Sequence, residues 1–135
     1  MRPVLILLTA AAVCAPGLAA TTKIETHLAG AAEVPGPGKG AGTATLTFDS
    51  DKGQVCYMLM ASGTDAPTMA HIHKGAAGVA GGVVVALAPP ATGMSEGCAP
   101  LAADVLADIV AHPANYYVNI HSAAFPAGTM RGQLK

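Results

Sequence analysis

The chain has 135 residues, enough for one compact domain of ordinary size. Hydrophobic residues make up 52% of it but aromatic residues only 4%, and 16 glycines and 10 prolines favour short strands and turns over a bulky helical core. Lysine and arginine total 7 against 8 aspartates and glutamates, so no basic surface for nucleic acid is expected. The low charge and the aliphatic content also argue against a disordered chain.

Residues 1–20 have the pattern of a secretory signal peptide. Arg2 gives a positive start, an apolar run covers residues 4–13, and Ala19 and Ala20 are small residues suited to cleavage. The run is shorter than the roughly 20 residues that a membrane-spanning helix needs. We therefore expect cleavage that also removes Cys14, no membrane span in the mature chain, and a secreted or periplasmic domain at residues 21–135.

The mature chain is predicted to be an antiparallel all-β domain. Residues 43–48 alternate threonine with Ala44, Leu46 and Phe48, the period of a half-buried strand. A turn at 49–53 and a second strand at 54–61 complete a hairpin. Further strands are expected near 22–29, 68–73, 82–88, 115–121 and 129–134, with glycine-rich loops at 34–40 and 75–82. One short helix is expected near 100–111, and the whole pattern is typical of a sandwich or barrel.

Two cysteines, Cys56 and Cys98, remain after cleavage. In an exported domain such a pair predicts one disulfide. Two buried free thiols are the alternative, and a metal-binding pair is disfavoured because the sequence has no C-x-x-C spacing.

The histidines carry the chemistry that the sequence suggests. If residues 69–73 form a strand, His71 and His73 share one face with Met69. The same parity puts Asn119 and His121 on one face of the strand near 115–121. If these faces meet, three imidazoles form a candidate metal site, with Asn119 and Met69 as further ligands or neighbours. Imidazole suits several transition metals, and the soft thioether favours copper over zinc. The alternative is a polar cluster that faces water or orders a loop.

The remaining candidate residues have simpler interpretations. His27 would be an additional ligand only if the first strand lay beside residues 68–73. Met58 and Met60 share a face and are expected to pack in the core. No Ser-His-Asp order, carboxylate pair or phosphate loop is present, so no catalytic residue is assigned and a non-catalytic domain is favoured.

The sequence resembles the CHRD domain, a module named from chordin and also found alone in exported bacterial proteins. The resemblance covers nearly the whole mature chain and is carried by blocks at 28–35, 42–44, 70–75, 81–85, 116–122 and 125–134. It departs from the family pattern at Thr129-Met130, where a glutamate usually precedes the terminal Arg-Gly-Gln.

The resemblance implies a fold and several residue roles. CHRD domains have an all-β layout similar to the Greek-key barrel of copper–zinc superoxide dismutases. The family's His-Ile-His and Asn-X-His elements fall on the candidate metal site already described. Glu33 and Arg131 lie in family motifs and are expected to form a structural ion pair. The growth-factor binding of chordin is not carried over, because cysteine-rich modules do that work there.

Three functions therefore remain open. The leading one is a non-catalytic exported domain that binds a transition metal, copper before zinc, through His71, His73 and His121. The second is a structural or adhesive module without metal, whose protein partner is unidentified. The third is a small dismutase-like oxidoreductase, which the missing second His/Asp cluster disfavours.

Overall fold

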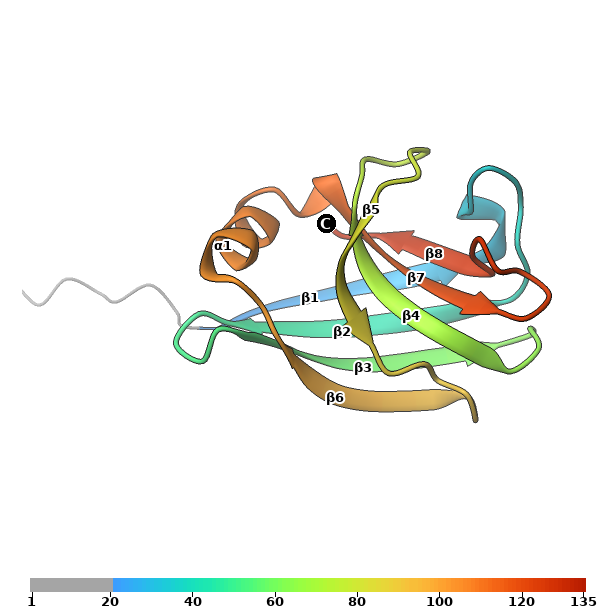
Figure 1. Ribbon diagram of the computed structural model, residues 1–135, viewed down its shortest axis with the longest axis horizontal. Helices are drawn as coiled ribbons and strands as arrows, with labels where there is room; N and C mark the ends of the chain where they lie inside the picture. Colours follow the sequence, from blue (N-terminus) through green and yellow to red (C-terminus); the bar gives the residue numbers. More distant parts are fainter. Residues whose placement is uncertain (1–20) are drawn as a thin grey trace, which may run out of the picture.

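The computed structural model describes residues 21–135 (Figure 1). The predicted signal peptide at residues 1–20 lies outside the described residues. The described part contains eight strands, one α-helix and two short 3-10 helices. The strands are β1 (Thr21–Ala29), β2 (Ala41–Asp49), β3 (Gln54–Ser62), β4 (Pro67–Lys74), β5 (Gly82–Leu87), β6 (Met94–Pro100), β7 (Tyr116–Ser122) and β8 (Met130–Gln133). The helices are α1 (Ala103–Ala111), η1 (Gly30–Ala32) and η2 (Pro113–Asn115).

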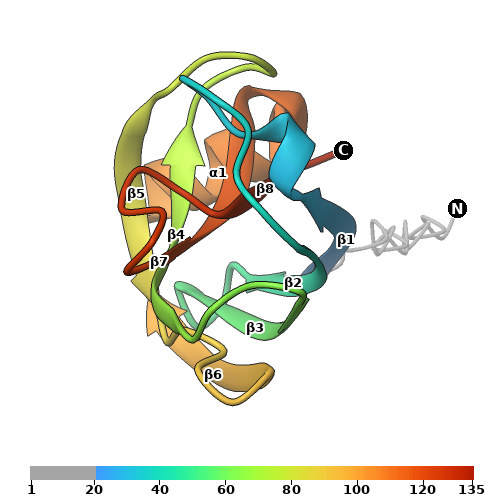
Figure 2. The same ribbon diagram turned by 90° about the vertical axis from the view of Figure 1, so that its right-hand side faces the viewer.

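The eight strands form one antiparallel sheet that curls into a nearly closed barrel, in the order β5-β4-β7-β8-β1-β2-β3-β6 (Figure 2). The chain crosses over from β3 to β4 and again, through α1, from β6 to β7, as in Greek-key arrangements. Near the two edge strands, Ser95 Oγ donates to the Ala88 carbonyl at 2.7 Å, and the Ala88 N–H donates to Tyr57 Oη at 2.9 Å. The predicted all-β antiparallel fold with one short helix is confirmed.

Alternation along the strands fills the interior of the barrel. Ala44, Leu46 and Phe48 of β2 are almost fully buried, while the threonines between them are partly exposed. The predicted hairpin is present, with Thr45 of β2 opposite Met58 of β3. The hydrophobic core is therefore built from one face of each strand, which leaves the other face to carry a site.

The segment before the helix differs from the sequence prediction. Residues 94–100 form β6, which the sequence did not predict, and α1 begins at Ala103 rather than at Pro100. No apolar alternation marks this edge strand; it is held by pairing with β3, and Pro100 is tolerated at its end. Leu106 and Ile109 of α1 are buried against the core.

A polar network ties α1 to the sheet. Asp108 of the helix accepts a hydrogen bond from Lys74 Nζ at 2.8 Å, and it also bonds the Tyr116 hydroxyl and, at 2.9 Å, His112 Nδ1. The bond from Lys74, followed by those from Tyr116 and His112, holds the pKa of the Asp108 carboxyl well below its ordinary value of 3.8.

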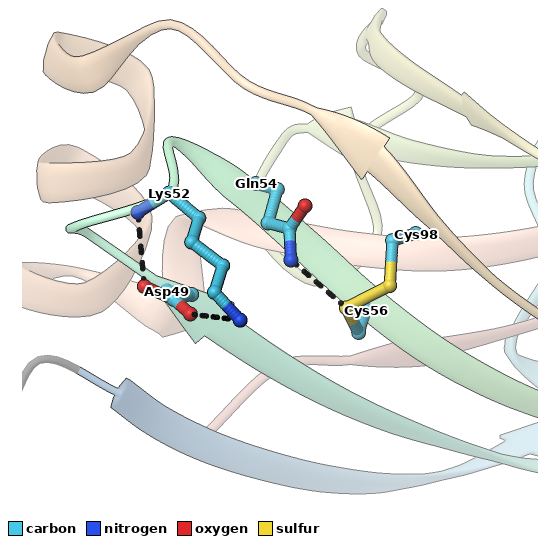
Figure 3. Close-up of a disulfide and its surroundings, with 5 residues drawn as sticks. All are labelled: Asp49, Lys52, Gln54, Cys56 and Cys98. Carbon is cyan, nitrogen blue, oxygen red and sulfur yellow. Dashed lines mark hydrogen bonds and ion pairs between the residues drawn. A yellow bond between two sulfur atoms is a disulfide. The ribbon is translucent and has the colours of Figure 1, made fainter.

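The predicted disulfide is confirmed (Figure 3). Cys56 of β3 and Cys98 of β6 are directly opposite each other, with Cα atoms 3.9 Å apart. Gln54 Nε2 donates to Cys56 Sγ at 3.4 Å. In the nearby turn, the Asp49 carboxylate accepts the backbone N–H of Lys52 at 3.0 Å and faces its ammonium at 3.7 Å. Edge strand β6 is thus covalently fixed to its neighbour.

Candidate metal centre

The candidate site lies on the outer face of β4 and β7, two neighbouring antiparallel strands. Ala70 and Ile72 of β4 are buried in the core, so the alternating His71 and His73 point away from it. In β7 the same alternation turns His121 to the outer face. Strand parity in the sequence predicted this arrangement.

The three imidazoles lie together. One ligand nitrogen from each of His71, His73 and His121 can be chosen so that all are within 4.8 Å of one another. His71 Nδ1 is 3.1 Å from His121 Nε2. Nitrogens bound to one transition-metal ion at about 2.0–2.1 Å are at most about 4.2 Å apart, so a small inward movement of the rings would complete a three-nitrogen site.

Backbone carbonyls orient two of the rings. His73 Nδ1 lies 2.9 Å from the Gly81 carbonyl, and His121 Nδ1 lies 2.9 Å from the Pro126 carbonyl. A carbonyl only accepts, so each Nδ1 carries a proton, and in the neutral ring each Nε2 keeps its lone pair. A carbonyl bonded to the far nitrogen is the usual arrangement behind metal-bound histidine. His73 is 7% exposed, and its Nε2 is buried without a hydrogen-bond partner.

His71 completes the cluster from its more exposed side. Because His121 Nε2 is an acceptor, His71 Nδ1 must hold the proton between the two rings. Burial, and then the charges of His121 and His73, lowers the pKa of His71, which favours the neutral imidazole that a metal requires. A metal ion would take the place of the proton on Nδ1, and that proton can move to Nε2 or to solvent.

The Tyr117 ring packs on His73, and the Arg131 guanidinium packs on Tyr117. The Tyr117 ring stacks on the His73 ring at 4.9 Å between centroids and 5° between planes. The Arg131 guanidinium lies 3.9 Å from the Tyr117 ring centroid. The Gly81 N–H donates to the Tyr117 hydroxyl at 3.0 Å, so one loop residue bonds both the tyrosine and the histidine.

The structure contains the ion pair expected between Glu33 and Arg131. Arg131 Nε donates to Glu33 Oε2 at 3.1 Å, and the two residues are only 3–4% exposed. Arg131 also donates to the Val79 carbonyl at 2.9 Å. The pair ties the loop after η1 to β8, and through Val79 to the loop that orients His73.

The remaining site residues fall in different places. Asn119 is opposite His71 in the β4–β7 register, is 1% exposed, and its Oδ1 lacks a hydrogen-bond partner. Met69 is opposite His121 and 45% exposed. His27 is exposed on β1, which β7 and β8 separate from β4, so the adjacency that its ligand role required does not occur.

Strand parity in the sequence also places Tyr117 on the same face as Asn119 and His121, but it does not predict that the Tyr117 ring stacks on His73. The carbonyls of Gly81 and Pro126 come from loops whose paths no local pattern predicts.

These features define an all-β, disulfide-linked domain with a three-histidine cluster on the outer face of its barrel. The CHRD domain family model matches residues 24–134, so the chain belongs to the CHRD domain family. No curated protein and no solved structure matches the chain. Among the described helices, none is long and apolar enough to cross a membrane.

Proposed function

We propose that this CHRD protein is an exported, non-catalytic domain that binds one transition-metal ion, copper before zinc, through His71, His73 and His121. The observation that carries the proposal is the His73 Nε2 atom. It is buried without a hydrogen-bond partner, the bond from Nδ1 to the Gly81 carbonyl leaves it the lone-pair nitrogen of the neutral ring, and it belongs to a cluster with two other imidazoles.

A buried polar atom without a partner is costly in a protein interior. The cost at His73 is explained if the atom receives a metal ion. The surroundings of the ring support this explanation, because the stacked Tyr117 ring and the bond to the Gly81 carbonyl favour the orientation in which Nε2 has no protein partner. A cluster that only ordered a loop would have no need to leave this lone pair free.

Copper is favoured over zinc by the residue beside the cluster. Met69 follows the same outward alternation as His71 and is opposite His121 in the register. A thioether is a soft ligand that suits copper, in particular Cu(I), better than zinc. Its exposure would let the side chain move toward an ion held by the imidazoles.

Export is supported by the chain's cysteine chemistry. The Cys56–Cys98 disulfide is suited to an oxidising compartment such as the periplasm or the cell exterior. The signal-peptide pattern of residues 1–20 points the same way.

The test is a calorimetric titration of the purified protein with Cu(II), Cu(I) and Zn(II) separately. We expect the His71→Ala/His73→Ala/His121→Ala variant to lose one tightly bound equivalent of copper. The matched control is His27→Ala, which removes an exposed imidazole outside the cluster and should keep that equivalent. Equal copper binding by the triple variant and the wild type would refute the proposal and favour a structural module.

The same copper-loaded protein tests the non-catalytic part of the proposal. Among residues 21–135, His71, His73 and His121 form the one group of three or more His, Cys, Asp or Glu side chains placed to hold a metal ion, so a second, zinc-type site of the dismutase kind has no such ligand set. We expect superoxide to decay no faster with the loaded protein than with the His71→Ala/His73→Ala/His121→Ala variant treated in the same way. Decay that depends on His73 would instead identify an oxidoreductase.

A further inference from the structure

Most methionines of the described chain lie on the outer surface of the barrel rather than in its core. Of the five described methionines only Met130 is buried; Met58, Met60, Met69 and Met94 are 42–52% exposed. The sequence interpretation of Met58 and Met60 as core residues is therefore wrong. Val55 and Leu59 of the same strand fill the core instead.

Three of these methionines occupy one patch on β3 and β6, which we call the methionine face: Met58, Met60 and Met94. Met60 and Met94 are directly opposite each other, and Met58 is two residues along on the same face. Directly opposite Cβ atoms are about 4.5–5.5 Å apart, and methionine has three rotatable bonds, so the three sulfur atoms can converge above the strands.

The surroundings of the methionine face fit a cation better than an apolar partner. Glu96 is exposed and directly opposite Met58, which places a carboxylate beside the thioethers. On the other side, Thr43 and Thr45 of β2 are opposite Met60 and Met58. The patch is therefore a small group of thioethers among oxygen-bearing side chains rather than a broad apolar surface.

The disulfide holds this face in register. Cys56 and Cys98 lie on the same face as the methionines, and Cys98 is two residues from Glu96 and four from Met94 on edge strand β6. A covalent bond at this point keeps β6 beside β3. Met94 therefore remains opposite Met60 even though its strand has a neighbour on one side only.

We propose that Met58, Met60 and Met94 bind a second, soft metal ion, Cu(I) or its analogue Ag(I), independently of the histidine cluster. Thioethers select soft monovalent ions and bind Zn(II) poorly. The two sites use different strands, β4–β7 and β3–β6. Strands β8, β1 and β2 lie between them along the sheet, and β5 lies between β4 and β6 where the barrel nearly closes. The methionine site therefore does not depend on the proposed function of the histidines.

The test is anaerobic titration of the full protein with Ag(I) and with Cu(I), read by competition with a chromophoric chelator. We expect Met58→Leu/Met60→Leu/Met94→Leu to bind one equivalent fewer than the wild type. The control Met69→Leu, an equally exposed methionine outside the face, should lose none. The His71→Ala/His73→Ala/His121→Ala variant should keep the methionine-bound equivalent.

A second readout follows the methyl groups of the methionines directly. On addition of Ag(I) to ¹³C-methyl-methionine protein, the NMR signals of Met58, Met60 and Met94 should shift together while that of buried Met130 stays in place. Unchanged stoichiometry in the triple leucine variant, or methyl signals that do not move, would overturn the proposal. Self-association that buries the face and blocks silver binding would overturn it equally.

Discussion

Removing the buried guanidinium of Arg131 should cost more stability than any other single truncation of a charged side chain described above. Arg131→Ala leaves the Glu33 carboxylate 4% exposed and without its cation, and Oε1 of that carboxylate already lacks a partner. Breaking a buried ion pair from one side costs about 3–5 kcal/mol. The contact with the Tyr117 ring and the bond to the Val79 carbonyl are lost as well.

The free energy of unfolding is measured by urea denaturation and checked by thermal melting. For a domain of this size the loss corresponds to a fall in Tm of roughly 10–20 °C. The double variant Glu33→Gln/Arg131→Met removes both charges and should recover most of the loss, because no uncompensated charge then remains buried. Lys23→Ala, which breaks the exposed pair between Lys23 and Glu25, should change little. An Arg131→Ala protein that melts within a few degrees of the wild type would refute this reasoning.

Three further changes have defined outcomes. In Gly81→Ala the new Cβ would lie 1.7 Å from a backbone oxygen of β4, so the loop that orients His73 must move. Copper affinity, measured by titration, should therefore fall about 10–100-fold. The control Gly82→Ala, whose Cβ meets open space, should leave the copper affinity unchanged. Cys56→Ala/Cys98→Ala opens a crosslink spanning 42 residues and should lower the free energy of unfolding by about 4 kcal/mol; a loss near zero in urea denaturation would contradict the account. The pKa of Asp108 is lowered in the folded protein, so its carboxylate stabilises the fold fully at pH values above the ordinary pKa of 3.8 and progressively less as the pH falls below 3.8. The Tm of the wild type should therefore exceed that of Asp108→Asn by less in acid than at neutral pH. A Tm difference that does not change with pH would refute the role of the charge.

The histidine cluster was predictable because its signal is local. Alternation along residues 69–73 and 117–121 fixes which side chains share a face, and the apolar neighbours Ile72 and Val118 show which face is buried. The hydrogen bonds from His73 and His121 to the Gly81 and Pro126 carbonyls, which select the tautomers of the rings, depend on loop paths, and these are decided by tertiary packing.

The methionine face shows where the local signal ends. In residues 54–61 both faces carry apolar side chains, so parity groups Met58 with Met60 but does not say which face is outside. Strand β6 has a related explanation. Its sequence has no alternation, and pairing with β3 together with the disulfide decides its conformation.

Metal binding by His71, His73 and His121 is tested most directly by the magnetic couplings between a bound Cu(II) ion and the imidazole nitrogens. ¹⁵N-histidine-labelled protein is loaded with one equivalent of Cu(II), and the imidazole nitrogens coupled to the metal are counted by electron–nuclear double resonance. The account predicts three coupled rings in the wild type and in His27→Ala, and fewer after His73→Ala. Couplings that are absent, or that are unchanged when His71, His73 and His121 are all replaced, would contradict it.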